Sequence, residues 1–350
     1  MSISKSRVIW IGLALLLVVA LVLPFLVKNY RVFQFNLVLV YAIAILGLNI
    51  LTGFNGQISL GHGAFYAIGA YAAAILMDRV GMPYWLTLPF SGVVCFVLGF
   101  LMGFPALRLA GHYLAVATLA LALAIPQLLK YKHLEHYTGG VQGIVLVKPD
   151  PPFTFRFLDQ PFSADRWLYF FTLAVTIVMF VLAWNLLRGR VGRALIAIRD
   201  HPIAAAAMGI NLAMFKSLTF GVSAAFTGVA GALGAVAIAF VSPDSFTVAL
   251  SIFLLVGVVV GGLASIPGAF FGAIFIQFVP NIADEMSKSA PAAIYGVLLI
   301  ILMYLMPLGV MGLVRKLWAR WQPGAARLQV NVKPGTSVPL PPDLSKESTT

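Results

Sequence analysis

Charged side chains are scarce in this chain. Only 10% of its 350 residues are Asp, Glu, Lys or Arg, whereas 61% are hydrophobic. Soluble domains are about one quarter charged, and so few polar residues could not cover cores of this size. The composition therefore excludes an ordinary soluble protein and predicts that lipid surrounds the chain.

Alternation of apolar and polar residues is also absent. In lipid every backbone N–H and C=O needs an internal partner, which only helices and closed β-barrels provide. Barrel strands alternate apolar and polar residues, but runs such as 13–23 and 298–305 are apolar on every side. We therefore predict an all-α polytopic membrane protein.

The motifs of several enzyme classes are missing. The chain contains no G-x-x-x-x-G-K-[ST] phosphate-binding loop, no G-x-S-x-G nucleophile motif and no H-E-x-x-H zinc motif. Its single cysteine, Cys95, lies in an apolar run and cannot form an internal disulfide. We expect no catalytic residue, no metal site and no cofactor, so the chain is not predicted to be an enzyme.

Charges are also absent at membrane depth. No Asp, Glu, Lys or Arg lies deep within any predicted span. Transporters driven by protons or ions usually carry a titratable or coordinating group there. If this chain transports a solute, the energy must come from a partner, or transport is passive.

Apolar runs long enough to cross a bilayer need about 20 residues. The sequence offers ten candidates, at residues 8–27, 32–51, 58–76, 85–107, 113–129, 167–187, 218–241, 247–263, 268–279 and 292–314. The ninth is too short to cross alone. It either extends backwards or forms a re-entrant hairpin with the eighth, which would leave eight spans. The first exceeds the apolar region of a signal peptide and is expected to remain as a span.

The basic residues are distributed unevenly between the two sides. If the N-terminus lies inside, the inner segments hold 14 of the 23 basic residues and three of the 11 acidic ones. The positive-inside rule therefore places both termini in the cytoplasm. The formal charge of +12 then reflects membrane orientation and contact with lipid, and no nucleic acid is expected.

The predicted organisation is one membrane domain, residues 1–321, followed by a tail. An outer loop at 130–166 and an inner loop at 188–216 interrupt the spans. Residues 322–350 are rich in Pro and Ser, which predicts a disordered cytoplasmic tail.

One apolar region is interrupted by glycines and polar side chains, in the sequence LTGFNGQISLGHGAF (51–65). Helix breaks at membrane depth are tolerated where protein packs around them or where they line water. One interpretation is a turn with tight helix packing. The other is that Asn55, Gln57, Ser59 and His62 face a solute path or its gate.

The inner loop contains a second informative segment, RDHPIAAAAMGIN (199–211). Asp200 or His201 can cap a helix that has Pro202 in its first turn, and Gly209 can end it. This short helix either lies on anionic lipid or docks into a cytoplasmic partner through its small alanine face.

Both segments resemble those of the branched-chain amino-acid permeases of ATP-binding-cassette (ABC) importers, specifically the LivM-type subunit. Four further stretches agree in sequence and in order: GHYLAVATLA (111–120), TGGVQGI (138–144), FVSPDSF (240–246) and VVVGGLASIPG (258–268). The resemblance covers roughly residues 34–313.

This resemblance implies a multi-subunit importer in the bacterial inner membrane. Its other members would be a second, LivH-type permease subunit, two cytoplasmic ATPase subunits and a periplasmic solute-binding protein. The inner segment would be the coupling helix, with the residues Arg199, Asp200, His201, Pro202, Ala205, Gly209 and Asn211. Thr138, Gly139, Gly140 and Gln142 would lie at the periplasmic entrance.

The predicted function is ATP-driven import of branched-chain or related amino acids. A passive channel for small neutral solutes explains the uncharged interior equally well, but not the alanine-rich inner helix. A structural scaffold leaves the interrupted polar segment unexplained. Related permeases for urea, short amides or aromatic acids also remain open.

Overall fold

The computed structural model describes residues 17–108, 111–151, 156–157, 160–161, 163–286, 288 and 290–320. Part of the first predicted span and the whole predicted tail, 322–350, lie outside these residues. The chain divides after Gly312 into two units, and the packing described below concerns the first.

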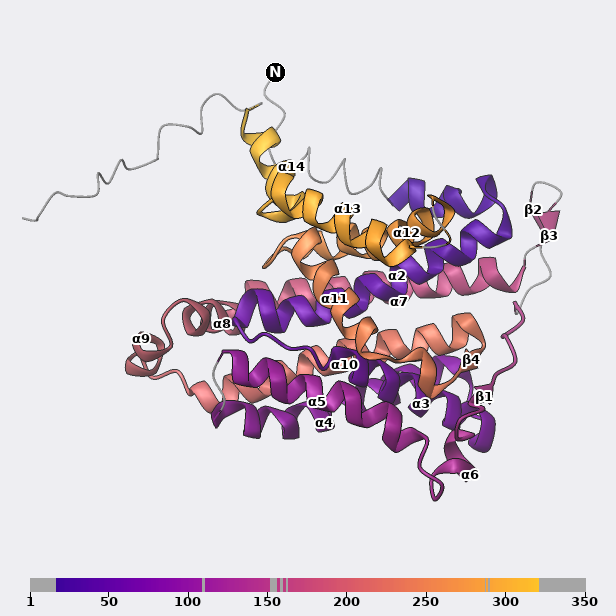
Figure 1. Ribbon diagram of the computed structural model, residues 1–350, viewed down its shortest axis with the longest axis horizontal. Coiled ribbons are helices and arrows are strands. Elements are labelled where there is room, and N and C mark those ends of the chain that lie inside the picture. The colour runs from indigo at the N-terminus through magenta and orange to yellow at the C-terminus, as the bar shows by residue number, and fades with distance from the viewer. Residues whose placement is uncertain are drawn as a thin grey trace, which may run out of the picture. The chain divides into compact units, whose positions relative to one another are not determined.

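Helices make up most of the described chain, which confirms the all-α fold class (Figure 1). After an apolar helical stretch, Leu17–Leu26, the helices are α2 (Asn29–Asn49), η1 (Ile50–Phe54), α3 (His62–Val80), α4 (Tyr84–Arg108), α5 (His112–Leu129), α6 (Glu135–Thr138), α7 (Ala164–Arg188), α8 (Arg190–Asp200), α9 (Pro202–Ala207), α10 (Leu212–Ile238), η2 (Pro243–Ser245), α11 (Val248–Gly261), α12 (Gly268–Met286), α13 (Pro291–Leu305) and α14 (Gly309–Arg320). The strands form two short antiparallel pairs, β1 (Ile144–Val145) with β4 (Phe240–Val241) and β2 (Arg156–Phe157) with β3 (Gln160–Pro161).

Seven helices among the described residues are long and apolar enough to cross a membrane. They are Asn29–Phe54, Tyr84–Pro105, His112–Leu129, Ala164–Arg188, Leu212–Ile238, Pro243–Gly261 and Ala292–Leu317. The predicted third and ninth spans, which correspond to α3 and α12, are helices outside this set. The predicted spans from the second to the tenth are therefore helical, the first lies partly outside the described residues, and the number of crossings remains a prediction.

Two boundaries differ from the sequence expectation. The ninth span was expected to end near residue 279, but α12 continues to Met286. At 1.5 Å per residue, its 19 residues extend about 28 Å, close to the hydrocarbon thickness. The last span was expected to be continuous, but α13 ends at Leu305 and α14 begins at Gly309. Pro307 lies between them and cannot extend a helix.

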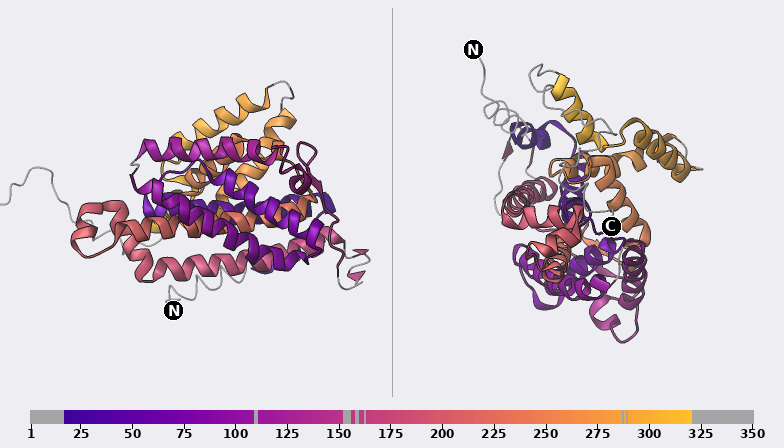
Figure 2. Two further views of the ribbon diagram at one scale, coloured as in Figure 1. Left: turned by 90° about the horizontal axis from the view of Figure 1, so that it is seen from below. Right: turned by 90° about the vertical axis from the view of Figure 1, so that its left-hand side faces the viewer.

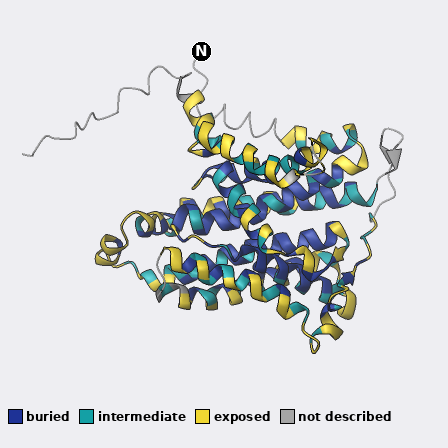
Figure 3. Ribbon diagram, in the orientation of Figure 1, coloured by how far each residue is buried: buried dark blue, intermediate teal, exposed yellow. Residues whose placement is uncertain are grey.

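The core is built around α10, which packs against α2, α3 and α4. Glycines allow this close packing. A Cβ atom at Gly69 would overlap the carbonyl oxygen of Gly228, and one at Gly231 would overlap that of Tyr66. Buried residues are concentrated where these helices meet, whereas α13 is largely exposed (Figure 3).

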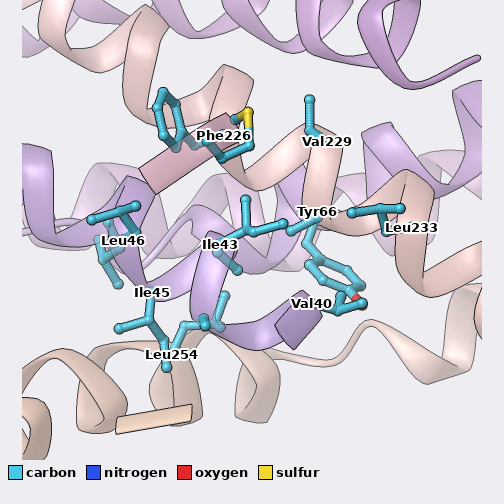
Figure 4. Packing of buried hydrophobic residues seen from close by; sticks show 14 of the residues in the cluster. Val40, Ile43, Ile45, Leu46, Tyr66, Phe226, Val229, Leu233 and Leu254 are labelled. Carbon is cyan, nitrogen blue, oxygen red and sulfur yellow. The ribbon is translucent and has the colours of Figure 1, made fainter. Parts of the chain in front are cut away.

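Side chains of α2 fill the space between α10 and α11 (Figure 4). Ile43 and Leu46 of α2 lie in one buried cluster with Phe226 of α10, and Ile45 lies beside Leu254 of α11. On one side, the backbone of α10 contacts the backbone of α3. On the other, side chains pack between α10 and α2. These contacts hold the two helices that flank residues 51–65 in place.

Candidate functional site

The interruption predicted between residues 51 and 65 is present. The chain leaves α2 through the π-helical turn η1, and no helix continues until α3 begins at His62. Gly56 has a φ of 75°, which glycine adopts without strain. π-Helical turns are rare and occur frequently at functional sites. In Figure 1 this unwound segment runs from the α8 end of the helices toward their middle.

Two neighbouring helices hold the start of α3. Thr118 Oγ1 of α5 accepts a hydrogen bond of 2.9 Å from the amide of Leu60. Ser251 Oγ of α11 accepts one of 2.9 Å from the amide of Gly63. These hydroxyls satisfy backbone donors that a helix start leaves free. The break is therefore supported by long-range contacts and is not a loose turn.

His62 lies in a buried hydrogen-bond chain with two serines. Its Nδ1 is 3.0 Å from Ser59 Oγ, and its Nε2 is 2.7 Å from Ser223 Oγ on α10. Ser223 itself donates to the carbonyl oxygen of Gly47, at 2.6 Å. Ser223 has one hydroxyl proton, which it donates to the Gly47 carbonyl oxygen. His62 Nε2 must therefore donate to Ser223 Oγ, and Nδ1 of the neutral ring accepts from Ser59 Oγ. Ser59, His62 and Ser223 are all fully buried.

Ser223→Ala should lower the free energy of unfolding by about 1–3 kcal/mol, because it leaves a buried imidazole N–H without an acceptor. Thermal unfolding of the purified protein in detergent measures this loss. Thr247→Ala is the control, since Thr247 is exposed and makes no side-chain cap to α11. Equal unfolding temperatures for the two variants would contradict the assigned hydrogen-bond chain.

Asn55 and Gln57 are also buried, with exposed fractions of 3% and 7%. Among the described residues, neither side-chain atom of Asn55 has a hydrogen-bond partner, and Gln57 Oε1 has none. Leaving buried polar atoms unpaired is costly. All four polar residues expected at a path or gate therefore lie inside the chain in this conformation, two of them paired and two not.

A second set of contacts surrounds η1. Asn49 donates from Nδ2 to the carbonyl oxygen of Ser265, at 2.9 Å, and accepts at Oδ1 from the amide of Ala264, at 3.0 Å. Arg199 of α8 donates from Nη1 to the carbonyl oxygen of Gly53, at 3.0 Å. Its Nε pairs with Asp200 Oδ1 at 2.9 Å. The helix break is thus linked both to the α11–α12 connection and to the inner loop.

The inner loop forms two helices where one capped helix was expected. Asp200 is the last residue of α8, and His201 is the N-cap of α9 but makes no side-chain cap hydrogen bond. Pro202 is in the first turn as expected. Gly209, with a φ of 82°, follows the end of α9. Asn211 does not belong to α9, because its side chain caps α10 by accepting from the amide of Met214 at 3.0 Å.

The alanine face of α9 is only partly available to a partner. Ala205 is 4% exposed, and its carbonyl oxygen accepts from the amide of Ile210. The large exposed side chains are Ile203, at 85%, and Met208, at 84%. The α8–α9 segment lies at one end of the helices in Figure 1 and in the left-hand view of Figure 2.

The predicted entrance residues form a tight turn at the opposite end. Thr138 is buried and donates to the carbonyl oxygens of Leu129 and Leu134, at 2.8 and 3.0 Å. Gly139 and Gly140 have φ values of 69° and 56°, and Gln142 is exposed. The turn leads into β1, whose Ile144 pairs with Val241 of β4.

The structure brings Arg199 to the interrupted segment and Ser59 to His62, but it places the entrance turn at the other end. Sequence reasoning missed Asn49, Ser223 and Ser251. The only feature of the sequence that could have identified them is that each is a polar residue in an otherwise apolar helix. Among the described residues, no group of three or more His, Cys, Asp or Glu side chains could hold a metal ion.

Comparison with known proteins assigns a family. The sequence model of the family described as "Branched-chain amino acid transport system / permease component" matches residues 30–307. The permease protein LivM of the high-affinity branched-chain amino-acid transport system of Salmonella typhimurium LT2 is 35% identical, over 86% of this chain and 74% of the relative. LivM of Escherichia coli K12 is also 35% identical, over 87% of this chain and 75% of the relative. LivH of E. coli K12 is 26% identical over 78% of this chain and 91% of the relative. No solved structure gives a significant match. The chain therefore belongs to the branched-chain amino-acid transport permease family.

Proposed function

We propose that this chain is the LivM-type membrane subunit of an ABC importer and translocates branched-chain or related amino acids. Its proposed partners are a LivH-type permease subunit, two cytoplasmic ATPases and a periplasmic binding protein that delivers the solute. The proposal places the chain in a bacterial inner membrane. The structural observation that carries it is the pair of highly exposed apolar side chains at the α8–α9 end, Ile203 on α9 and Met208 just after it, which would suit an apolar contact with a cytoplasmic partner.

The contacts of α8 connect the exposed α9 end of the protein with the membrane interior. ATP-driven closure of the ATPases would displace α9 and, through it, α8. Arg199 holds the carbonyl oxygen of Gly53, so the displacement would reach η1 and the start of α3. A neutral interior suits a zwitterionic amino acid, which carries its own balancing charges.

The proposed orientation has both termini in the cytoplasm and the α8–α9 end inside. Contacts between connecting segments agree with ten alternating crossings, because each contact joins two segments that this alternation places on the same side of the membrane. Which side is cytoplasmic rests on the distribution of the basic residues. The outer set includes Lys130 with Asp244, the Arg79 side chain with the His136 carbonyl, and β1 with β4. The inner set joins Arg199 to Gly53 and Asn49 to Ser265.

Cysteines at two exposed positions test this orientation in a Cys95→Ser background. Val147, which is 87% exposed, and Met208, which is 84% exposed, lie on opposite predicted sides. A membrane-impermeant thiol reagent should label Val147→Cys in intact cells and Met208→Cys only after permeabilisation. The reverse pattern would overturn the orientation.

Uptake by the reconstituted complex tests the function itself. The complex of both permeases and both ATPases, with leucine-loaded binding protein, should accumulate leucine in liposomes that have access to ATP. Accumulation should persist when the proton gradient is collapsed, because no Asp, Glu, Lys or Arg lies deep within a predicted span. Leucine flux through this chain alone without ATP would instead establish a passive channel.

A further inference from the structure

A small cavity lies between α2, α3 and α10, next to β4 and the start of α11. Its volume is about 80 Å³. The residues that matter here are Tyr41, Tyr66, Ile238, Phe240, Ser245 and Leu250, and the full lining contains no charged side chain. Two of the lining residues, Ile238 and Phe240, are 46% and 41% exposed, so the cavity lies close to the surface of the chain. The four polar residues of the interrupted segment do not border it.

Two tyrosine hydroxyls are available at this cavity. The rings of Tyr41 and Tyr66 stack with centroids 6.3 Å apart, and Phe246 packs on Tyr66 at 6.0 Å. Tyr66 is only 4% exposed, and Figure 4 shows its ring between α2 and α10. Within the described part of the chain, neither hydroxyl forms a hydrogen bond to the protein. Both tyrosines line the cavity, so their hydroxyls are free to bond to a molecule inside it.

The size of the cavity limits what can enter it. A dry cavity of about 150 Å³ accommodates benzene, which has six carbon atoms. By the same proportion, a cavity of about 80 Å³ takes roughly three to four carbon atoms. Isopropyl, isobutyl and sec-butyl groups meet this limit, and a benzyl group exceeds it. Aromatic and aliphatic walls with a few polar groups are typical of sites for such ligands.

We propose that this cavity receives the branched aliphatic side chain of the transported amino acid, with the Tyr66 and Tyr41 hydroxyls bonded to its polar end. This inference rests on the proposed function and makes this chain itself selective for side-chain size. Ser245 lines the cavity and follows Asp244, whose carboxylate forms an ion pair with Lys130. That ion pair fixes this segment without placing a net charge beside the zwitterion.

A cysteine at Ser245 reports occupancy of the cavity. In the assembled complex with binding protein and a Cys95→Ser background, leucine should slow alkylation of Ser245→Cys by N-ethylmaleimide at least fivefold. Phenylalanine should not slow it. Adding Leu250→Ala should enlarge the cavity and allow phenylalanine to protect the thiol as well. Tyr137→Cys is the control, because Tyr137 is exposed in the predicted outer loop and does not line the cavity, so its cysteine should react equally with and without leucine.

A second comparison tests the hydroxyl. Tyr66→Phe should raise the KM for leucine uptake about tenfold while ATPase assembly is retained. Tyr71→Phe is matched to it, since Tyr71 is on the same helix, is 2% exposed and does not line the cavity, and its KM should stay unchanged.

The outcomes separate this inference from the function on which it rests. A complex that accumulates leucine but shows no protection of Ser245→Cys, or no difference between the two phenylalanine variants, would mean that the cavity holds water only. A wild-type complex that accumulates no leucine would overturn the proposed function. Leucine protection of the thiol in that same complex would still establish the binding site.

Discussion

The double variant Ile203→Asp/Met208→Asp should lose its ATPase subunits. Both side chains are more than four-fifths exposed on and just after α9, so aspartates there should not disturb the membrane helices. In a docked interface each would place a charge in an apolar contact and leave it poorly solvated. Recovery of the ATPases with the purified permease should fall at least tenfold, while the two permease subunits remain associated.

Val147→Asp is the matched control, because Val147 is equally exposed at the opposite end of the protein. It should retain the ATPases fully. If α9 instead rests on the lipid surface, the double variant would also keep its ATPases and its leucine-stimulated ATP hydrolysis, and the coupling role of this helix would be wrong. Ala205→Trp is a poorer test, since Ala205 is buried in its own loop and added bulk would distort the loop directly.

Arg199→Met should separate ATP hydrolysis from transport. The methionine keeps an apolar stem of similar length but removes the hydrogen bond to the carbonyl oxygen of Gly53. A hydrogen bond to a charged group contributes about 1.5–3 kcal/mol, so the link between α8 and η1 should weaken strongly. We expect the ATPases to stay bound and leucine uptake per ATP hydrolysed to fall about tenfold.

The control for this prediction is Arg193→Met. Arg193 is also on α8, is exposed, and makes no ion pair within the described residues. Its uptake per ATP should be unchanged. If the two variants behave alike, or if Arg199→Met simply loses the ATPases, Arg199 serves docking or stability and not transmission.

The fold class followed from the sequence because hydrophobicity and the shortage of charge are properties of composition. The break before α3 was also predictable, since Gly56 and Gly61 interrupt an apolar run locally. The residues elsewhere in the chain that form hydrogen bonds with that break were not predictable. Ser223 lies 161 residues from His62, and no periodicity within either segment indicates that they meet.

The inner loop shows the same limit at shorter range. Pro202 and Gly209 are residues with special backbone dihedral preferences, and they lie at the start of α9 and just after its end, as expected. Asp200 was a candidate cap because of its chemistry, but α8 extends through it and its carboxylate pairs with Arg199. Which alanine would be buried also depended on the path of the chain after α9, which the alanine run itself does not specify.

The contacts between α3 and α10 have a mechanical consequence. Gly69 lies against the Gly228 carbonyl and Gly231 against that of Tyr66, so backbone touches backbone with no layer of side chains that could change rotamer. Closely packed surfaces of this kind do not deform continuously. We therefore expect α3 and α10 to move together as one rigid unit in any change of conformation.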